Sequence, residues 1–169
     1  MRIKKFDSEF NAVLLNGQQE EITLDPSWVT NEKGLHTDAV TFAEYLGRYL
    51  LDPSREPDRF DKNKVVQKIG RNAVTTNQLR NFFGEVRSVE MSIRDDSFDP
   101  KAGAFVMLRP RLAYAKVRAT KDNDKNRMRE FEEAMTALMA KVQEPEHFQN
   151  FVDFLEATVA YHKASGGKN

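Results

Sequence analysis

Apolar residues at helical spacing recur through most of the chain from Thr37 onward, and this pattern constrains the fold more than any other feature. Before the 76–93 segment, Thr75 and Gln78 form a capping box, which is typical of a helix start. The apolar residues that follow lie on one stripe, as expected for a helix that buries a single face. That stripe contains Leu79, Phe82, Phe83, Val86, Val89 and Ile93. Helices of this kind are stable when their stripes pack against one another.

The same period predicts further helices along the chain. Gly70 ends one of them, and Asp124 is the expected N-cap of another. Pro110 lies inside an apolar stripe, so we expect a kink or two helices that meet near residue 109. Residues 52–61 contain two prolines and alternating charges, which favour a loop. The predicted helices cover residues 37–51, 64–69, 76–93, 105–119, 128–142 and 145–159.

The ends of the chain lack this pattern. Residues 1–35 contain turn formers such as Asn16-Gly17 and show no sustained period, so we expect an irregular arm in which Trp28 packs on the bundle or on a neighbour. Residues 166–169 begin with two glycines and are expected to form a disordered tail. No β alternation competes with the helical stripes. The predicted fold is all-α: a single-domain bundle of five to six helices over residues 36–165.

Bulk composition excludes several classes of protein. At 169 residues and 40% hydrophobic composition, the chain suits one domain with a proper core. It contains no cysteine, which excludes disulfides, thiolate metal clusters and thiol catalysis and fits a reducing compartment. No apolar run is long enough to span a membrane, and Asp7 and Glu9 interrupt any signal peptide. We therefore expect a soluble cytoplasmic protein with no membrane partner.

Charge is balanced overall but not along the chain. The 26 Lys and Arg residues equal the 26 Asp and Glu residues in number. Residues 60–129 hold 16 basic against 8 acidic residues, whereas residues 1–59 hold 7 against 11 and residues 130–169 hold 3 against 7. A basic middle between acidic ends indicates a polyanionic partner, with nucleic acid as the leading class. A solvated domain with unevenly spread charges is the alternative.

The cations of the basic stretch fall opposite the predicted buried faces. Arg80 and Arg87 are seven residues apart on one helix, and Arg111 and Arg118 repeat this spacing on the next with Tyr114 between them. Spaced arginines suit phosphates, and an exposed tyrosine ring suits base stacking; a solvated basic face and a packed tyrosine are the alternatives. The cluster also includes Arg109 and Lys116 on an adjoining face, Lys62, Lys64, Lys68 and Arg71 before the first helix, and Lys121, Lys125, Arg127 and Arg129 after the second.

Two segments carry a resemblance to a known family. They read TTNQLRNFFGEVR at residues 75–87 and LRPRLAYAKVR at residues 108–118. Together they resemble the paired signatures of the small α-helical subunit of type III-A CRISPR effector complexes, the Csm small subunit family. The order and spacing of the two segments, the chain length and the helical pattern agree, so the resemblance covers residues from about 60 to 165.

The resemblance implies a non-catalytic subunit in antiviral defence. Copies would stack into a filament within the effector complex, alongside other subunits, and would help hold the guide RNA with its target RNA. Reading phosphates makes physical sense for such a subunit because the guide varies in sequence while its backbone does not. The family's RNA-binding residues map onto Arg80, Arg87, Arg109, Arg111 and Lys116, with Lys68, Arg71 and Arg118 as further members. Tyr114 is added from the stacking argument.

A helix-turn-helix DNA-binding regulator is the competing hypothesis. In that interpretation a short helix over 62–69 and a turn through Gly70–Val74 precede a recognition helix that begins at Thr75. The side chains placed to read base edges would be Asn77, Gln78 and Arg80.

An enzyme is disfavoured because no catalytic or cofactor-binding constellation is apparent. His147 and His162 are about 22 Å apart along one predicted helix, so they cannot share a metal there. The compact acidic group Asp95, Asp96 and Asp99 lacks the glycine and glutamate of a calcium loop and is expected to cap helices. The sequence therefore predicts no catalytic residue, no metal and no cofactor.

Overall fold

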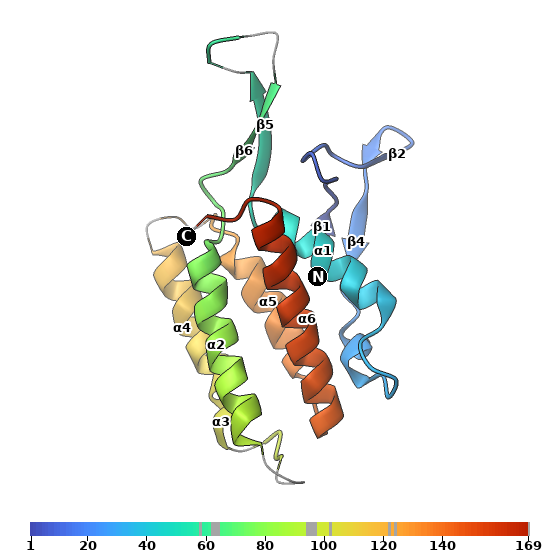
Figure 1. The fold of residues 1–169 in the computed structure, drawn as a ribbon, viewed down its shortest axis with the longest axis vertical. Coiled ribbons are helices and arrows are strands. Elements are labelled where there is room, and N and C mark those ends of the chain that lie inside the picture. The colour runs from blue at the N-terminus through green and yellow to red at the C-terminus, as the bar shows by residue number, and fades with distance from the viewer. Residues whose placement is uncertain are drawn as a thin grey trace.

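The computed structural model describes residues 1–57, 59–61, 65–93, 98–101, 103–121, 123 and 125–168. Long helices lie side by side in a bundle, a β-hairpin projects from one end of it, and small strands lie on the flank beside the first helix (Figure 1). The helices are α1 (Thr37–Tyr49), α2 (Thr76–Ser92), α3 (Gly103–Val106), α4 (Leu108–Thr120), α5 (Met128–Met139) and α6 (Pro145–Ala164). The remaining elements are β1 (Arg2–Lys4), β2 (Leu14–Leu15), β3 (Gln18–Gln19), β4 (Glu21–Thr23), the 3₁₀ helix η1 (Pro26–Thr30), β5 (Pro53–Pro57) and β6 (Val65–Ile69).

Helix α2 follows its sequence signature. The Thr75 hydroxyl accepts a hydrogen bond from the Gln78 N–H at 3.2 Å, and the Gln78 side chain accepts one from the Thr75 N–H at 2.7 Å. The predicted capping box is therefore confirmed. Most of the stripe is buried, while its members Phe83 and Ile93 are half-buried.

The apolar stretch around Pro110 forms two helices. This is one of the two outcomes expected from the sequence, the other being a single kinked helix. Helices α3 and α4 meet at Met107, and Pro110 is the third residue of α4. In this first turn a backbone N–H has no partner within the helix, so proline costs little there. Asp124, the expected cap of α5, lies outside the described residues. Asn126 supports the start of α5 instead, because its side-chain oxygen accepts from the Met128 N–H at 2.9 Å.

Helices α1 and α6 pack closely because Gly47 lies at their crossing. A Cβ built on Gly47 would be only 2.7 Å from the backbone nitrogen of His162. Next to this crossing, Trp28 packs against the Phe42 ring, with the centroids 5.8 Å apart. The buried amide of Asn150 donates to the carbonyl of Val29 at 2.9 Å. These contacts fix η1 on the bundle, so Trp28 contacts the protein's own core.

The N-terminal arm contains short paired strands, so the expectation that it is irregular is wrong. Strand β1 pairs antiparallel with β4, and β2 pairs with β3. Asn16 and Gly17 connect the second pair with φ angles of 52° and 79°, as two-residue hairpins require. Strands of two or three residues are too short to display a period of two, which is why the pattern missed them.

The second correction concerns residues 53–69. Strands β5 and β6 pair antiparallel from Pro53 opposite Ile69 to Pro57 opposite Val65, where we expected a loop and a short helix. The β-branched residues of β6 favour a strand once a partner strand is present. Because residues 65–69 form a strand, the first helix of the helix-turn-helix hypothesis does not exist. Lys62 and Lys64 lie outside the described residues.

The C-terminal residues contact the bundle, where we expected a disordered tail. The Lys168 carbonyl accepts a hydrogen bond from the Thr76 N–H at 2.9 Å, and the Gly167 N–H donates to the His162 carbonyl at 3.0 Å. Gly167 is buried, and a Cβ on it would be 2.3 Å from Nδ1 of His162. The end of the chain therefore supplies a hydrogen-bond acceptor to the N-terminus of α2.

His162 makes the stability depend on pH. The ring is buried, its Nε2 donates to the Val74 carbonyl at 2.9 Å, and burial lowers its pKa below the ordinary 6.5. The unfolded chain therefore binds the extra proton more readily, and the free energy of unfolding falls as the pH drops below about 6.5. The slope for this one proton is at most about 1.4 kcal/mol per pH unit. Urea unfolding at pH 7.5 and pH 5.0 should show a smaller loss in His162→Gln; equal losses would contradict this assignment.

Candidate nucleic-acid interface

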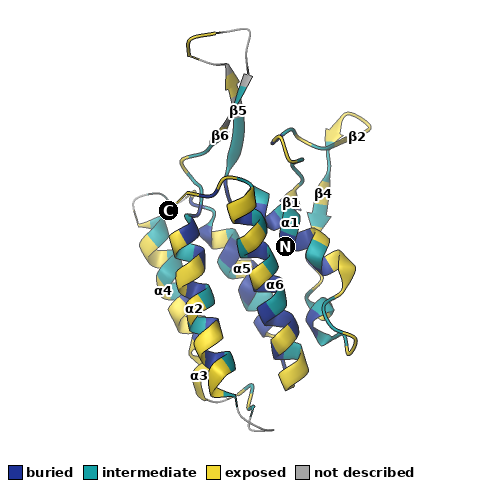
Figure 2. Cartoon of the chain, viewed as in Figure 1, coloured by how far each residue is buried: buried dark blue, intermediate teal, exposed yellow. Residues whose placement is uncertain are grey.

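Helix α2 presents Arg80 and Arg87 on an exposed face. Both residues are exposed, as the opposite apolar stripe requires. Exposed and buried residues alternate along the ribbon of α2 (Figure 2). Arg87 forms an ion pair with Glu90 at 2.6 Å, and its guanidinium lies 5.9 Å from the centroid of the Phe83 ring. A cation held in this way remains accessible to a phosphate in solvent.

Only a narrow strip of the surface of helix α4 is buried. Leu108 and Leu112 are fully buried, whereas Tyr114 is 65% and Val117 59% exposed. The cations predicted from the sequence lie on the two flanks of this strip. Lys116 forms an ion pair with Glu132 of α5 at 3.3 Å on one flank. Arg109 lies about 100° from Leu108 around the helix axis, on the same flank as Lys116.

A groove of about 530 Å³ lies between the other flank of α4 and helix α2. Arg111 crosses it to form an ion pair with Glu85 of α2. The Arg118 guanidinium lies 5.9 Å from the centroid of the Tyr114 ring. The groove is lined by Gln78, Asn81, Phe82 and Glu85 from α2 and by Arg111, Tyr114, Ala115, Arg118 and Ala119 from α4.

The structure divides the predicted cluster instead of gathering it on one face. Arg80 and Arg87 are about 100–160° around α2 from Asn81 and Glu85, which line the groove. They therefore lie on a different face from Arg111 and Arg118. Sequence spacing placed each pair correctly on its own helix but carried no information on how the two helices are rotated against each other.

Lys68 and Arg71 belong to a third location, the base of the β5–β6 hairpin. They line a hollow of about 1060 Å³ together with Lys125 and residues of both strands. Both side chains are exposed, and Lys68 forms an ion pair with Glu56 of β5. The hairpin base lies at the end of the bundle where α2 begins and α4 ends (Figure 1).

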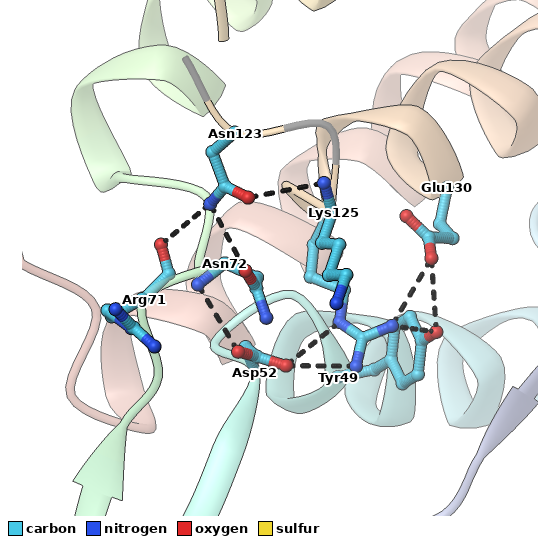
Figure 3. A network of polar contacts seen from close by, with 8 residues as sticks. Tyr49, Asp52, Arg71, Asn72, Asn123, Lys125 and Glu130 are labelled. Carbon is cyan, nitrogen blue, oxygen red and sulfur yellow. Dashed lines mark hydrogen bonds and ion pairs between the residues drawn. The ribbon is translucent and has the colours of Figure 1, made fainter. Parts of the chain in front are cut away.

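A polar network fixes this hairpin base to the bundle (Figure 3). Arg127 contacts Asp52 through Nη2 at 2.9 Å and Glu130 through Nη1 at 3.2 Å, and it stacks on the Tyr49 ring at 4.3 Å. Burial raises the pKa of Tyr49 to about 12, so its hydroxyl stays protonated at neutral pH. Burial alone would lower the pKa of Arg127, but Tyr49, Asp52 and Glu130 raise it above its ordinary value. Arg127 is therefore a structural cation, where the sequence placed it in the basic cluster.

Asparagines continue this network between the hairpin and the α4–α5 connection. Asn123 donates to the Arg71 carbonyl at 3.2 Å and to the Asn72 side chain at 3.1 Å. The Asn72 N–H donates to Asp52 at 3.2 Å, and the Arg127 N–H donates to the Asn72 carbonyl at 2.7 Å. The backbone of Arg71 is thereby held in place while its side chain is exposed.

Acidic neighbours partner several of the predicted cations. Lys68, Arg87, Arg111 and Lys116 each form an ion pair with a glutamate. Ion pairs at the surface contribute only about 0–1 kcal/mol each, so a phosphate can replace the carboxylate at little cost. The pairs orient the cations and leave them able to exchange a carboxylate for a phosphate.

Reasoning from sequence did not single out Asn81 and Glu85, which line the groove, because neither adds to the positive charge by which candidate residues were chosen. Only their place beside Arg111 and Tyr114 marks them. The part of the chain that the structure describes contains no cluster of three His, Asp or Glu side chains able to share a metal ion. No helix among the described residues is long and apolar enough to cross a membrane.

Comparison with known protein families identifies a match. The family model described as Csm2 Type III-A matches residues 59–168, which is well over half of the chain. The match begins between β5 and β6 and includes α2 to α6, and therefore both walls of the groove. No curated protein matches, and no solved structure matches.

Proposed function

The chain belongs to the Csm2 Type III-A family, the small subunits of type III-A CRISPR complexes, and on this premise we propose that it binds the backbones of guide RNA and target RNA. It does so as a non-catalytic cytoplasmic subunit that stacks in several copies beside other effector subunits, in antiviral defence. The family assignment confirms the resemblance stated from the two motifs.

The observation that carries RNA binding is the position of the excess positive charge. Residues 60–129 hold 16 basic against 8 acidic residues, and the exposed members Arg80, Arg87, Arg109, Arg111 and Arg118 lie on α2 and α4. Spaced cations on exposed helices bind phosphates and release counterions whatever the base sequence. A subunit that supports a variable guide needs binding of this kind.

Stacking of copies is supported by charge and by exposed apolar side chains. The flanking stretches, residues 1–59 and 130–169, hold 11 and 7 acidic residues against 7 and 3 basic ones. They complement the basic middle of another copy. Val106 of α3 and Met107 at the junction of α3 with α4 are 38% and 49% exposed, and these apolar side chains are suited to a protein contact.

Replacement of Arg80 and Arg87 by alanine tests the RNA-binding proposal. We expect weaker retention of single-stranded RNA, and a plot of log affinity against log salt that is less steep by about 1.4 for two lost phosphate contacts. Helix content should be unchanged because both residues lie off the buried face and alanine favours helix. Fluorescence anisotropy across a salt series and circular dichroism provide the two measurements.

The matched control is Lys33→Ala with Lys141→Ala. These lysines are exposed and lie outside the basic stretch, so the control removes the same net charge from elsewhere. It should retain RNA almost as the parent does. Equal retention by the folded Arg80/Arg87 variant and the parent would remove this face of α2 from the proposal.

A further inference from the structure

The groove between α2 and α4 differs chemically from the basic faces around it. It contains an exposed aromatic ring, Tyr114, with the Arg118 guanidinium beside it at 5.9 Å from the ring centroid. Aromatic rings and planar guanidinium groups are the side chains on which unstacked RNA bases pack. A phosphate does not stack on an aromatic ring, whereas a base does. The exposed ring therefore indicates a base as the ligand.

The polar groups of the groove also suit a base edge. The Asn81 side chain forms no hydrogen bond within the described part of the chain, so its amide is available as donor and acceptor. The Gln78 oxygen accepts from the Thr75 N–H, which leaves its NH₂ group to donate to a ligand. Glu85 repels a phosphate but accepts hydrogen bonds from the N–H groups of bases.

Small residues give the groove its depth. Ala115 and Ala119 lie on the wall formed by α4, and Phe82 is buried beneath the α2 wall. The volume of about 530 Å³ falls within the range of about 300–1,000 Å³ typical of small-ligand sites. The Arg111–Glu85 ion pair joins the two walls and holds their spacing.

We propose that this groove is a subsite for one unpaired nucleobase of the bound RNA. The base stacks on Tyr114, its edge meets Asn81, Gln78 and Glu85, and Arg118 neutralises the adjoining phosphate. The subsite rests on the proposed RNA binding and adds a contact that requires a base. Since amides and a carboxylate can pair with several base edges, binding should require a base without requiring a particular sequence.

The test compares two RNAs with the full chain: a twelve-nucleotide uridine RNA and a ribose-phosphate strand of the same length without bases. The parent should bind the uridine RNA about 5- to 150-fold more tightly than the abasic strand, the range expected when one base stacks on a tyrosine. Tyr114→Ala should remove most of this difference and leave the affinity for the abasic strand unchanged. Tyr114→Phe should preserve the difference because the ring is retained.

Val117→Ala is the matched control, since it also truncates an exposed apolar side chain of α4 but lies outside the groove. It should bind both strands as the parent does.

Equal, salt-dependent binding of both strands by the parent would overturn the base subsite and leave phosphate binding standing. Failure of the parent to bind either strand would overturn the RNA-binding proposal as well. A Tyr114→Ala variant that lost assembly with other subunits, with both RNA affinities intact, would assign the groove to a protein contact and overturn the subsite.

Discussion

Leu112→Ala should destabilise the protein by about 2–5 kcal/mol, because it removes buried methyl groups and leaves a cavity. Leu112 has no exposed surface, and with Leu108 it supplies the fully buried large side chains of α4. A typical domain has a net stability of about 5–15 kcal/mol, so the loss is a large fraction of the total. The melting temperature should fall by about 4–20 °C. Urea unfolding and thermal scans measure both quantities.

Val117→Ala on the same helix is the comparison for this result. Val117 is 59% exposed, so its truncation should change the free energy of unfolding by no more than about 0.5 kcal/mol. Both variants should keep their stability ranking whether or not RNA is present. A Leu112→Ala protein as stable as the parent would show that α4 does not bury this face.

Arg127→Met should lower the free energy of unfolding by about 1.5–3 kcal/mol, the usual contribution of hydrogen bonds to a charged group. The methionine keeps an unbranched apolar side chain at this position but removes the guanidinium from the Tyr49 ring and leaves Asp52 and Glu130 without their shared cation. The side chain of Asp52 is only 17% exposed, so water replaces the lost partner incompletely. The base of the hairpin, which carries Lys68 and Arg71, should loosen, and backbone amide exchange in β5 and β6 should accelerate.

Two further variants separate charge from geometry. Arg127→Lys keeps the positive charge but loses the planar fork that contacts Asp52 and Glu130 together, so its stability should lie between those of the parent and Arg127→Met. Lys125→Met removes an exposed cation from the same connection and should cost about 0.5 kcal/mol or less. Equal losses in Arg127→Met and Lys125→Met would contradict the structural role of Arg127.

The helices were predictable because their signals are local. The capping box at Thr75, the break near Pro110 and the stripe from Met128 to Val142 each depend on neighbours within a few residues. The hairpin of β5 and β6 was predicted wrongly because Val65 to Ile69 becomes a strand through its partner strand, whose paired residues lie eight to sixteen positions earlier in the chain. The Asn16-Gly17 turn was visible in the sequence, but its strands were too short to show a pattern.

The residues of the candidate site also fall into two groups, those that the sequence predicted and those that depend on how the helices pack. Reasoning from sequence placed Arg80 and Arg87 on an exposed face of one helix, and the structure leaves both exposed. It also placed Tyr114 between Arg111 and Arg118, and all three line the groove. Asn81 and Glu85 were missed because their importance depends on which face of α2 meets α4.

By itself, the sequence determined the long helices, their buried faces, the basic middle stretch and the family, since periodicity, charge and motifs are properties of the linear chain. Only the tertiary structure decided that the cations lie on separate faces, that Arg127 holds the hairpin base, and that a groove opens beside Tyr114. The physical reason is that the rotation of one helix against another is set by packing of side chains distant in sequence.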